Sequence, residues 1–347
     1  MTDKNRKEKE IFYDPEEIQS DLYSWWRVIT AITIMVLTCV DVWLIGENYG
    51  LLYACLFVPL LSGYIITCFV LGPHDCGHGS MFTTVRQNKI AGRMLGFFCL
   101  TPFYSWSREH NMHHAHFGKK QALGLGDLDT MTFEQYKNSS WTKRLIYRAM
   151  RTPLFALWLA PANWLIDMRL LTYDTKELYE FTTEQRNSRL MSTVFHIALL
   201  SGLYYISLNL FVVYCVSFYI SMVIGMILFY VQHQHDSAHF GFKSNEDWYY
   251  PESSYYGSSY TKLPAVLEYL FTGINYHHIH HYDSSIPGYS LRKVHIDNDC
   301  ENDPDLYVLD SFSKFIKCLT KNNVWDEDAE SWITISETEH RRISNAR

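Results

Sequence analysis

The chain has 347 residues, of which 19% are charged and 16% aromatic, and its formal net charge at pH 7 is −7. This acidic balance excludes a nucleic-acid-binding protein, which needs a basic surface. The basic residues are strongly segregated, because residues 28–85 and 190–242 contain no Lys or Arg. About 20 helical residues span a bilayer, so each stretch is long enough to cross it twice. The composition predicts an integral membrane protein.

The predicted elements follow this segregation in chain order. Residues 1–27 are polar and charged, lack the apolar core of a cleavable signal, and are expected to form a cytoplasmic segment. A membrane domain over 28–295 follows, and 296–347 is expected to be a polar tail. We predict four transmembrane helices at about 28–45, 51–71, 190–207 and 211–231. Two moderately apolar stretches, Ile90–Trp106 and Thr152–Ile166, are interrupted by proline, and the first predicts a re-entrant or interfacial helix.

The orientation follows from the distribution of basic residues, which concentrate on the cytoplasmic side of membrane proteins. With the N-terminus inside, the exterior turns near 46–50 and 208–210 contain no Lys or Arg. The same orientation brings both termini and every histidine motif to the cytoplasmic face. We therefore expect a multi-pass protein with a cytoplasmic cap.

Nine histidines form a spaced pattern. The motifs are His74-Asp-Cys-Gly-His78, His110-Asn-Met-His113-His114, the isolated His233, and His277-His-Ile-His280-His281. On a helix, residues at i, i+3 and i+4 share one face, so the second and fourth motifs each predict a patch of three imidazoles. One ion takes about four to six ligands, and nine histidines therefore indicate two metal ions.

Imidazole suits iron, copper and zinc, so the donor type alone does not choose the metal. Zinc sites normally use three or four ligands, which would leave histidines in surplus. A redox pair of irons uses the surplus and can reduce dioxygen. A site at the membrane surface suggests a long apolar chain as substrate, whose C–H bonds side chains alone cannot oxidise.

For the ninth ligand the sequence offers three neighbouring histidines: we choose His233, and His235 or His239 could take its place. Other histidines are expected outside the ligand set: His116, His196, His278, His295 and His340. Of these, His295 and His340 are interpreted as ordinary loop and tail residues. Metal-bound imidazoles usually donate their second N–H to a carboxylate or carbonyl. The candidate acids are Asp75, Glu109, Asp127, Asp129, Asp236 and Asp283.

Over roughly residues 26–295 the chain resembles the membrane fatty acid desaturase family. The likeness is carried by His74-Asp-Cys-Gly-His-Gly-Ser80, His110-Asn-Met-His-His-Ala-His116 and Phe229-Tyr-Val-Gln-His-Gln234. The bacterial acyl-lipid branch is similar in Gly257-Ser-Ser-Tyr-Thr-Lys-Leu-Pro264 and in His277-His-Ile-His-His281 with Ile286-Pro-Gly-Tyr289.

The resemblance implies an all-helical fold of four membrane spans under a cytoplasmic helical cap that holds two iron ions. Its implied ligands are His74, His78, His110, His113, His114, His233, His277, His280 and His281. The implied reaction removes two hydrogens from adjacent methylenes of a fatty acyl chain, on a lipid rather than on coenzyme A, and reduces O2. No His-Pro-Gly-Gly haem signature is present, so a separate ferredoxin or cytochrome is the expected electron donor.

Three other functions compete with this interpretation. A hydroxylase, ketolase or conjugase could use the same di-iron scaffold. A zinc-dependent membrane hydrolase or metal-binding receptor would need only three or four clustered histidines. A transporter would carry ionisable residues inside its spans, where only Asp41 and His196 are found.

Overall fold

The structure is a computed structural model that describes residues 9–117, 130–152, 159, 161–162, 165–166, 182–236, 250–329 and 331–344. Within these residues the chain is mainly helical, and its strands form two small two-stranded sheets. Four helices of the described chain are long and apolar enough to cross a membrane. The predicted class, a helical membrane protein with four spans, is confirmed.

The four long helices are α2 (Asp21–Tyr49), a composite helix over Leu51–Cys76, α11 (Thr183–Ile206) and α12 (Leu208–His233). Most of them extend beyond the predicted spans by a turn or more. Hydropathy marks only the part that suits hydrocarbon, whereas the helices continue into polar surroundings, as α12 does to reach His233. The composite helix contains α3 (Leu51–Ala54), η1 (Cys55–Phe57), α4 (Val58–Phe69) and the π-helical η2 (Val70–Cys76).

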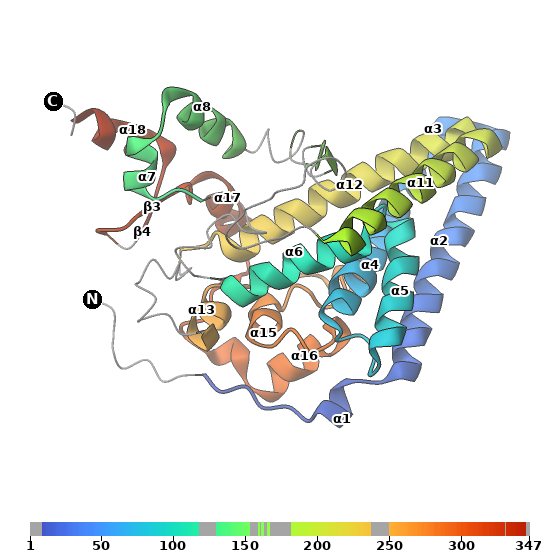
Figure 1. Cartoon of the computed structure of the whole chain (residues 1–347), viewed down its shortest axis with the longest axis horizontal. Coiled ribbons are helices and arrows are strands. Elements are labelled where there is room, and N and C mark those ends of the chain that lie inside the picture. The colour runs from blue at the N-terminus through green and yellow to red at the C-terminus, as the bar shows by residue number, and fades with distance from the viewer. Residues whose placement is uncertain are drawn as a thin grey trace.

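At the end remote from the histidines, the spans are joined by two tight turns. α2 is followed by Gly50, whose φ of +90° suits glycine, and α11 and α12 are separated by Ser207 alone. Ser207 donates a hydrogen bond to Glu47 (2.6 Å), and the Asn209 side chain donates to the Gly46 carbonyl (2.9 Å). Figure 1 shows α2, α11 and α12 meeting near α3. The two turns therefore hold the helix pairs together.

Between the second and third spans the chain forms a helical hairpin of α5 (Val85–Phe98) and α6 (Phe103–His116). The bend lies at residues 99–102, where Leu100 has a φ of +50° and Pro102 precedes α6. The hairpin replaces the single irregular helix expected over Ile90–Trp106. The second irregular stretch, over 152–166, lies mostly outside the described residues.

The cap is assembled mainly from short elements after the fourth span. They are α13 (Tyr250–Tyr256), β1 (Tyr260–Thr261), α14 (Ala265–Leu270), α15 (His277–Tyr282), α16 (Gly288–Asp297), η4 (Cys300–Asn302), β2 (Val308–Leu309), α17 (Phe312–Thr320), β3 (Val324–Asp326), β4 (Ser331–Ile333) and α18 (Ile335–Ser344). Three earlier helices complete the described structure: α1 (Pro15–Ile18), α7 (Phe133–Asn138) and α8 (Trp141–Met150). Strands β1 and β2 pair in parallel, and β3 and β4 antiparallel. The expected polar tail thus contains helices and strands.

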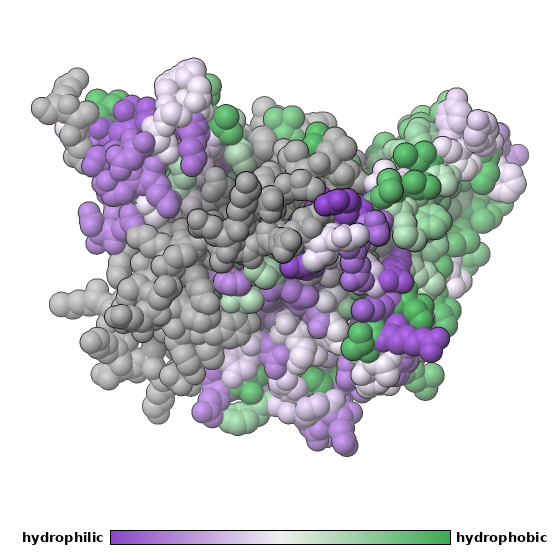
Figure 2. Space-filling model, in the orientation of Figure 1, coloured by the Kyte–Doolittle hydropathy of each residue, from purple (hydrophilic) through white to green (hydrophobic). Residues whose placement is uncertain are grey.

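The surface divides in the same way as the fold. In Figure 2 apolar residues gather on the right, over the long helices, whereas the described cap elements at the upper left are mostly hydrophilic. The long helices expose many large apolar side chains, such as Leu52 at 81% and Leu208 at 60%. Exposed apolar faces of this extent on soluble proteins are rare, but they match the hydrocarbon of a bilayer.

The segment that leads into α15 depends on a close backbone approach. Gly273 has a φ of +77°, and a Cβ there would lie 2.3 Å from the carbonyl oxygen of Gly288. Gly79 has a similar φ of +80°, but a Cβ there would meet nothing within 4 Å. A side chain at Gly79 would therefore meet backbone strain alone, whereas one at Gly273 would meet both backbone strain and steric overlap.

We predict that Gly273→Ala destabilises the protein more than Gly79→Ala. Both replacements carry the left-handed strain of about 1–2 kcal/mol, and only the first adds an overlap of about 1–3 kcal/mol. Thermal unfolding of the detergent-solubilised variants, followed by tryptophan fluorescence, measures the difference. Equal unfolding temperatures would show that the backbone approach at Gly288 contributes nothing.

Candidate metal centre

The predicted ligands converge at one end of the helix bundle from segments far apart in the sequence. These are the end of the second span (His74, His78), α6 (His110, His113, His114), the last residue of α12 (His233), and α15 (His277, His280, His281). Figure 1 shows α6 and α15 lying together beside the lower end of α4. The fold thus brings all the predicted residues into one region.

Local helix geometry explains how the first motif reaches the others. Pro73 lies inside η2, where it has no amide hydrogen to continue the normal i to i−4 ladder, and the helix widens to a π-helix. Ser107 of α6 donates a hydrogen bond to the Pro73 carbonyl (3.0 Å). The wider turn and this bond hold the first motif against α6.

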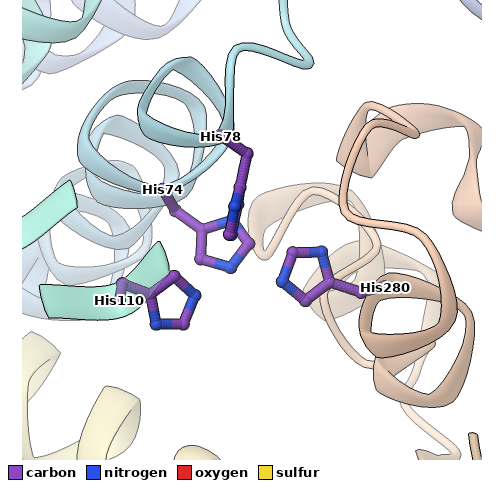
Figure 3. A group of neighbouring side chains, drawn as sticks. All are labelled: His74, His78, His110 and His280. Carbon is purple, nitrogen blue, oxygen red and sulfur yellow. The ribbon is translucent and has the colours of Figure 1, made fainter. Parts of the chain in front are cut away.

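One group of four histidines surrounds a single point. Its members are His74, His78, His110 and His280, and one nitrogen from each lies within 4.8 Å of the others. Figure 3 shows their rings turned toward one another from three elements. The unbonded Nε2 atoms of His74 and His78 are buried, with no hydrogen-bond partner among the described residues. Buried nitrogens left open in this way suit a metal ion.

A second group lies beside the first and has three members, His113, His233 and His281. One nitrogen from each again lies within 4.8 Å of the others, and all three side chains are buried. The two groups touch through the rings of His113 and His110, whose centroids are 5.7 Å apart.

The remaining two predicted ligands, His114 and His277, lie next to members of both groups. The Nε2 atom of His114 lies 3.2 Å from that of His110 and 3.0 Å from that of His280. The Nε2 atom of His277 lies 3.0 Å from that of His233. His114 also stacks on His281, with ring centroids 4.1 Å apart, and the His277 ring lies 5.4 Å from that of His280, so these two histidines connect the groups.

Asp75 fixes the orientation of the first histidine. One oxygen of its buried carboxylate contacts Nδ1 of His74 at 2.8 Å, and the other accepts from the Gly288 amide at 3.0 Å. The carboxylate thereby holds the proton on Nδ1 and leaves Nε2 open toward the group. The same side chain joins the second span to the start of α16.

Burial keeps the imidazoles outside the spans neutral. It lowers the pKa of His113 to about 3. For the others, burial and then neighbouring histidines move the pKa well below its usual value: His78, His110, His114, His277, His280 and His281. A neutral ring has a free lone pair, which is the form that binds a metal.

Three aromatic residues that were not expected at the site lie against the histidine groups. Trp106 stacks on His110 with ring centroids 4.4 Å apart. Phe117 lies 4.8 Å from His233 and 4.5 Å from His281, and Phe229 lies 5.0 Å from His233. Each is close in sequence to a motif, but only the fold shows that these rings face the pocket.

The structure distinguishes between two of the candidates for the ninth ligand. His233 belongs to the second group, whereas His235 stacks on Tyr307 with centroids 4.5 Å apart and joins neither histidine group. His239 lies outside the described residues. Among the described candidates, the geometry favours His233.

The other candidate acids have different partners. Glu109 pairs with Arg189 (2.9 Å), Asp236 with Lys317 (2.6 Å), and Asp283 accepts from the Tyr13 hydroxyl (2.6 Å). Asp127 and Asp129 lie outside the described residues. Of the candidate acids, Asp75 is the one whose contact with a predicted ligand, His74, is described above.

The histidines expected outside the ligand set belong to neither of the two histidine groups. His116 contacts the carbonyl of Met112, His196 is buried within α11, and His340 is exposed. His295 was expected in a loop, and this expectation is wrong: it is buried in α16 and contacts His278. Sequence spacing gave no sign of this pair, because the two residues lie on different helices.

Comparisons with known proteins agree with this geometry. The fatty acid desaturase family profile matches residues 51–309. A Bacillus subtilis protein named fatty acid desaturase is 30% identical over 287 residues, covering 82% of this chain and 78% of the relative. A Picosynechococcus sn-1 oleoyl-lipid 12-desaturase is 27% identical over 281 residues, covering 79% of this chain and 76% of the relative.

A shorter match reaches a sunflower (Helianthus annuus) protein named sn-2 acyl-lipid omega-3 desaturase (ferredoxin), chloroplastic. It is 28% identical over 114 residues, covering 33% of this chain and 23% of the relative. The names agree with desaturation, and none is that of a hydrolase or a transporter. Together with the histidine geometry and the four spans, they show that this protein is an oxidoreductase of the fatty acid desaturase family.

Proposed function

We propose that the nine histidines hold two iron ions and that the enzyme uses them to desaturate acyl chains of membrane lipids. The observation that carries the proposal is the division of buried imidazoles into two adjoining groups. One group would supply five ligands (His74, His78, His110, His114, His280) and the other four (His113, His233, His277, His281). All-nitrogen donor sets of this size suit a redox metal better than zinc.

The protein's own residues prepare the pocket in three ways. Asp75 orients His74, burial keeps the rings neutral, and the rings of Trp106, Phe117 and Phe229 pack against His110, His233 and His281. Bound iron would supply the activation of O2 that side chains cannot provide. The reaction balances when two acyl hydrogens, two protons and two electrons reduce one O2 to two waters as the double bond forms.

The substrate is proposed to be an acyl chain of a glycerolipid rather than of coenzyme A. The pocket adjoins the ends of the second and fourth spans, so a chain already in the bilayer is close to it. The Picosynechococcus relative is named for an oleoyl-lipid, in keeping with this choice.

A separate protein is proposed to supply the electrons, either a ferredoxin or a cytochrome. The name of the sunflower relative includes ferredoxin. We further propose that both termini and the metal pocket face the cytoplasm. The turns at the opposite end, near 46–50 and 208–210, contain no Lys or Arg, as expected of exterior turns.

We predict that His113→Ala and His280→Ala each abolish desaturation and lower the iron content below the two ions per chain expected of the native enzyme. The matched control is His116→Ala, which is on the same helix as His113 but contacts the Met112 carbonyl. Iron is measured by mass spectrometry of the purified variants, and new double bonds by lipid profiling in a host without desaturases. Turnover retained by His113→Ala, or one zinc in place of iron, would refute the di-iron proposal.

We predict that Asp75→Asn weakens iron binding about 10–100-fold, because the neutral amide holds the His74 ring less firmly. The control is Asp283→Asn, whose carboxylate contacts Tyr13 and Ser285. Iron retention is followed during titration with a chelator, alongside thermal unfolding of the metal-free proteins. Equal chelator sensitivity of Asp75→Asn and the native enzyme would remove Asp75 from the site.

The lipid carrier can be tested with the purified enzyme and a ferredoxin reduction system. We expect oleoyl phospholipid in vesicles to be desaturated and oleoyl coenzyme A to remain unchanged. The products are separated by gas chromatography after conversion to methyl esters. Faster conversion of the thioester would contradict the choice of carrier without affecting the di-iron proposal.

A further inference from the structure

A third cluster of metal-binding side chains lies in the cap, outside the predicted iron ligands. It consists of His278 of α15, His295 of α16 and Cys300 of η4, and we call it the His-His-Cys cluster. His278 is on the same short helix as His277, His280 and His281, but its partners come from later in the chain. The cluster is therefore a separate group of donors behind the predicted iron pocket.

The donors of the His-His-Cys cluster are close together and dry. One atom from each of the three side chains lies within 4.8 Å of the others. Nε2 of His278 is 3.0 Å from Nδ1 of His295. The exposed fractions are 0% for His278, 3% for His295 and 0% for Cys300. The cluster is thus as buried as the predicted iron ligands.

The backbone around Cys300 brings its thiol to the histidines. α16 ends at Asp297, and Asp299 then adopts a left-handed φ of +50° that reverses the chain into η4. Asn298 between them exchanges two hydrogen bonds of 2.8 Å with the backbone of Phe12. The N-terminal segment therefore closes over this turn.

At least one nitrogen of the cluster is not used in a hydrogen bond and could bind a metal ion. Nε2 of His295 is buried and has no hydrogen-bond partner among the described residues. The ring nitrogens of His278 and His295 approach as closely as those of His277 and His233 in the predicted iron pocket, at 3.0 Å in both cases. The same packing of imidazoles thus occurs at both places, and here a thiol joins them.

We propose that the His-His-Cys cluster binds one structural zinc ion. Two imidazoles and one thiolate are common donors for zinc, which favours three or four such ligands. Tyr255 is buried next to Cys300, and its hydroxyl hydrogen-bonds the thiol. Charges of both signs lie near the cluster: Lys9, Lys262 and Glu301 near His295, and Asp299 and Asp303 near Cys300.

A zinc ion here would stabilise the predicted iron pocket from behind. It would join α15, which carries three of the predicted iron ligands, to α16 and η4. α15 has only six residues, too few to be stable as an isolated helix. A bond from His278 to a fixed ion would therefore fix the position of α15, and with it the positions of His277, His280 and His281.

The proposal is tested by the zinc content of the full-length enzyme, purified without chelators and then dialysed against zinc. We expect one zinc per chain in the native protein in addition to iron, and loss of that zinc in Cys300→Ser and His295→Gln. The matched controls are Cys318→Ser, a thiol also 0% exposed, and His340→Gln. Both controls should keep the zinc, and all folded variants should keep their iron.

Cobalt substitution gives a second readout that does not depend on activity. Cobalt bound to the native cluster should show a thiolate charge-transfer absorption that Cys300→Ser lacks and Cys318→Ser retains. Native protein without stoichiometric zinc, or zinc unchanged in both Cys300→Ser and His295→Gln, would overturn the proposal. Because iron is counted in the same samples, failure of the zinc site is distinguishable from failure of the di-iron site.

Discussion

The central constraint on this protein is that a dense group of imidazoles must stay neutral and dry. An isolated buried polar group without a partner costs about 1–3 kcal/mol, so a pocket of such rings is stable only if something satisfies them. Asp75 does so for Nδ1 of His74, while Nε2 of that ring and of His78 are left open. Under the di-iron proposal the metal satisfies these remaining atoms, and the cap and its ions then depend on each other for stability.

The membrane spans provide the fixed frame for this pocket. The Ser207–Glu47 and Asn209–Gly46 bonds join the helix pairs at one end, whereas the pocket lies at the other. The π-helical turn at Pro73 lets the second span reach α6 without a separate loop. The predicted ligands His74, His78 and His233 are therefore positioned by the ends of membrane helices. The three predicted ligands of α15 are positioned by short cap elements.

Much of this arrangement could be predicted from sequence. The four spans follow from hydropathy, and the histidine motifs from regular spacing on helices. Sequence could not choose His233 over His235, because the two residues are only two positions apart. The structure distinguishes them, since His233 joins His113 and His281 whereas His235 stacks on Tyr307. Nor could it pair His278 with His295, or direct Phe117 to the pocket, since those contacts join different segments. The ligand roles themselves remain predictions.

The shortness of α15 has a consequence for how the enzyme is made. Its histidines follow all four membrane helices in the chain, and α15 packs mainly on α13 and α16, which flank it in sequence. During synthesis all four membrane helices emerge from the ribosome before residue 281 does. The histidine groups consequently stay incomplete until all four membrane helices have been synthesised, so under the di-iron proposal the ions would be loaded after that point.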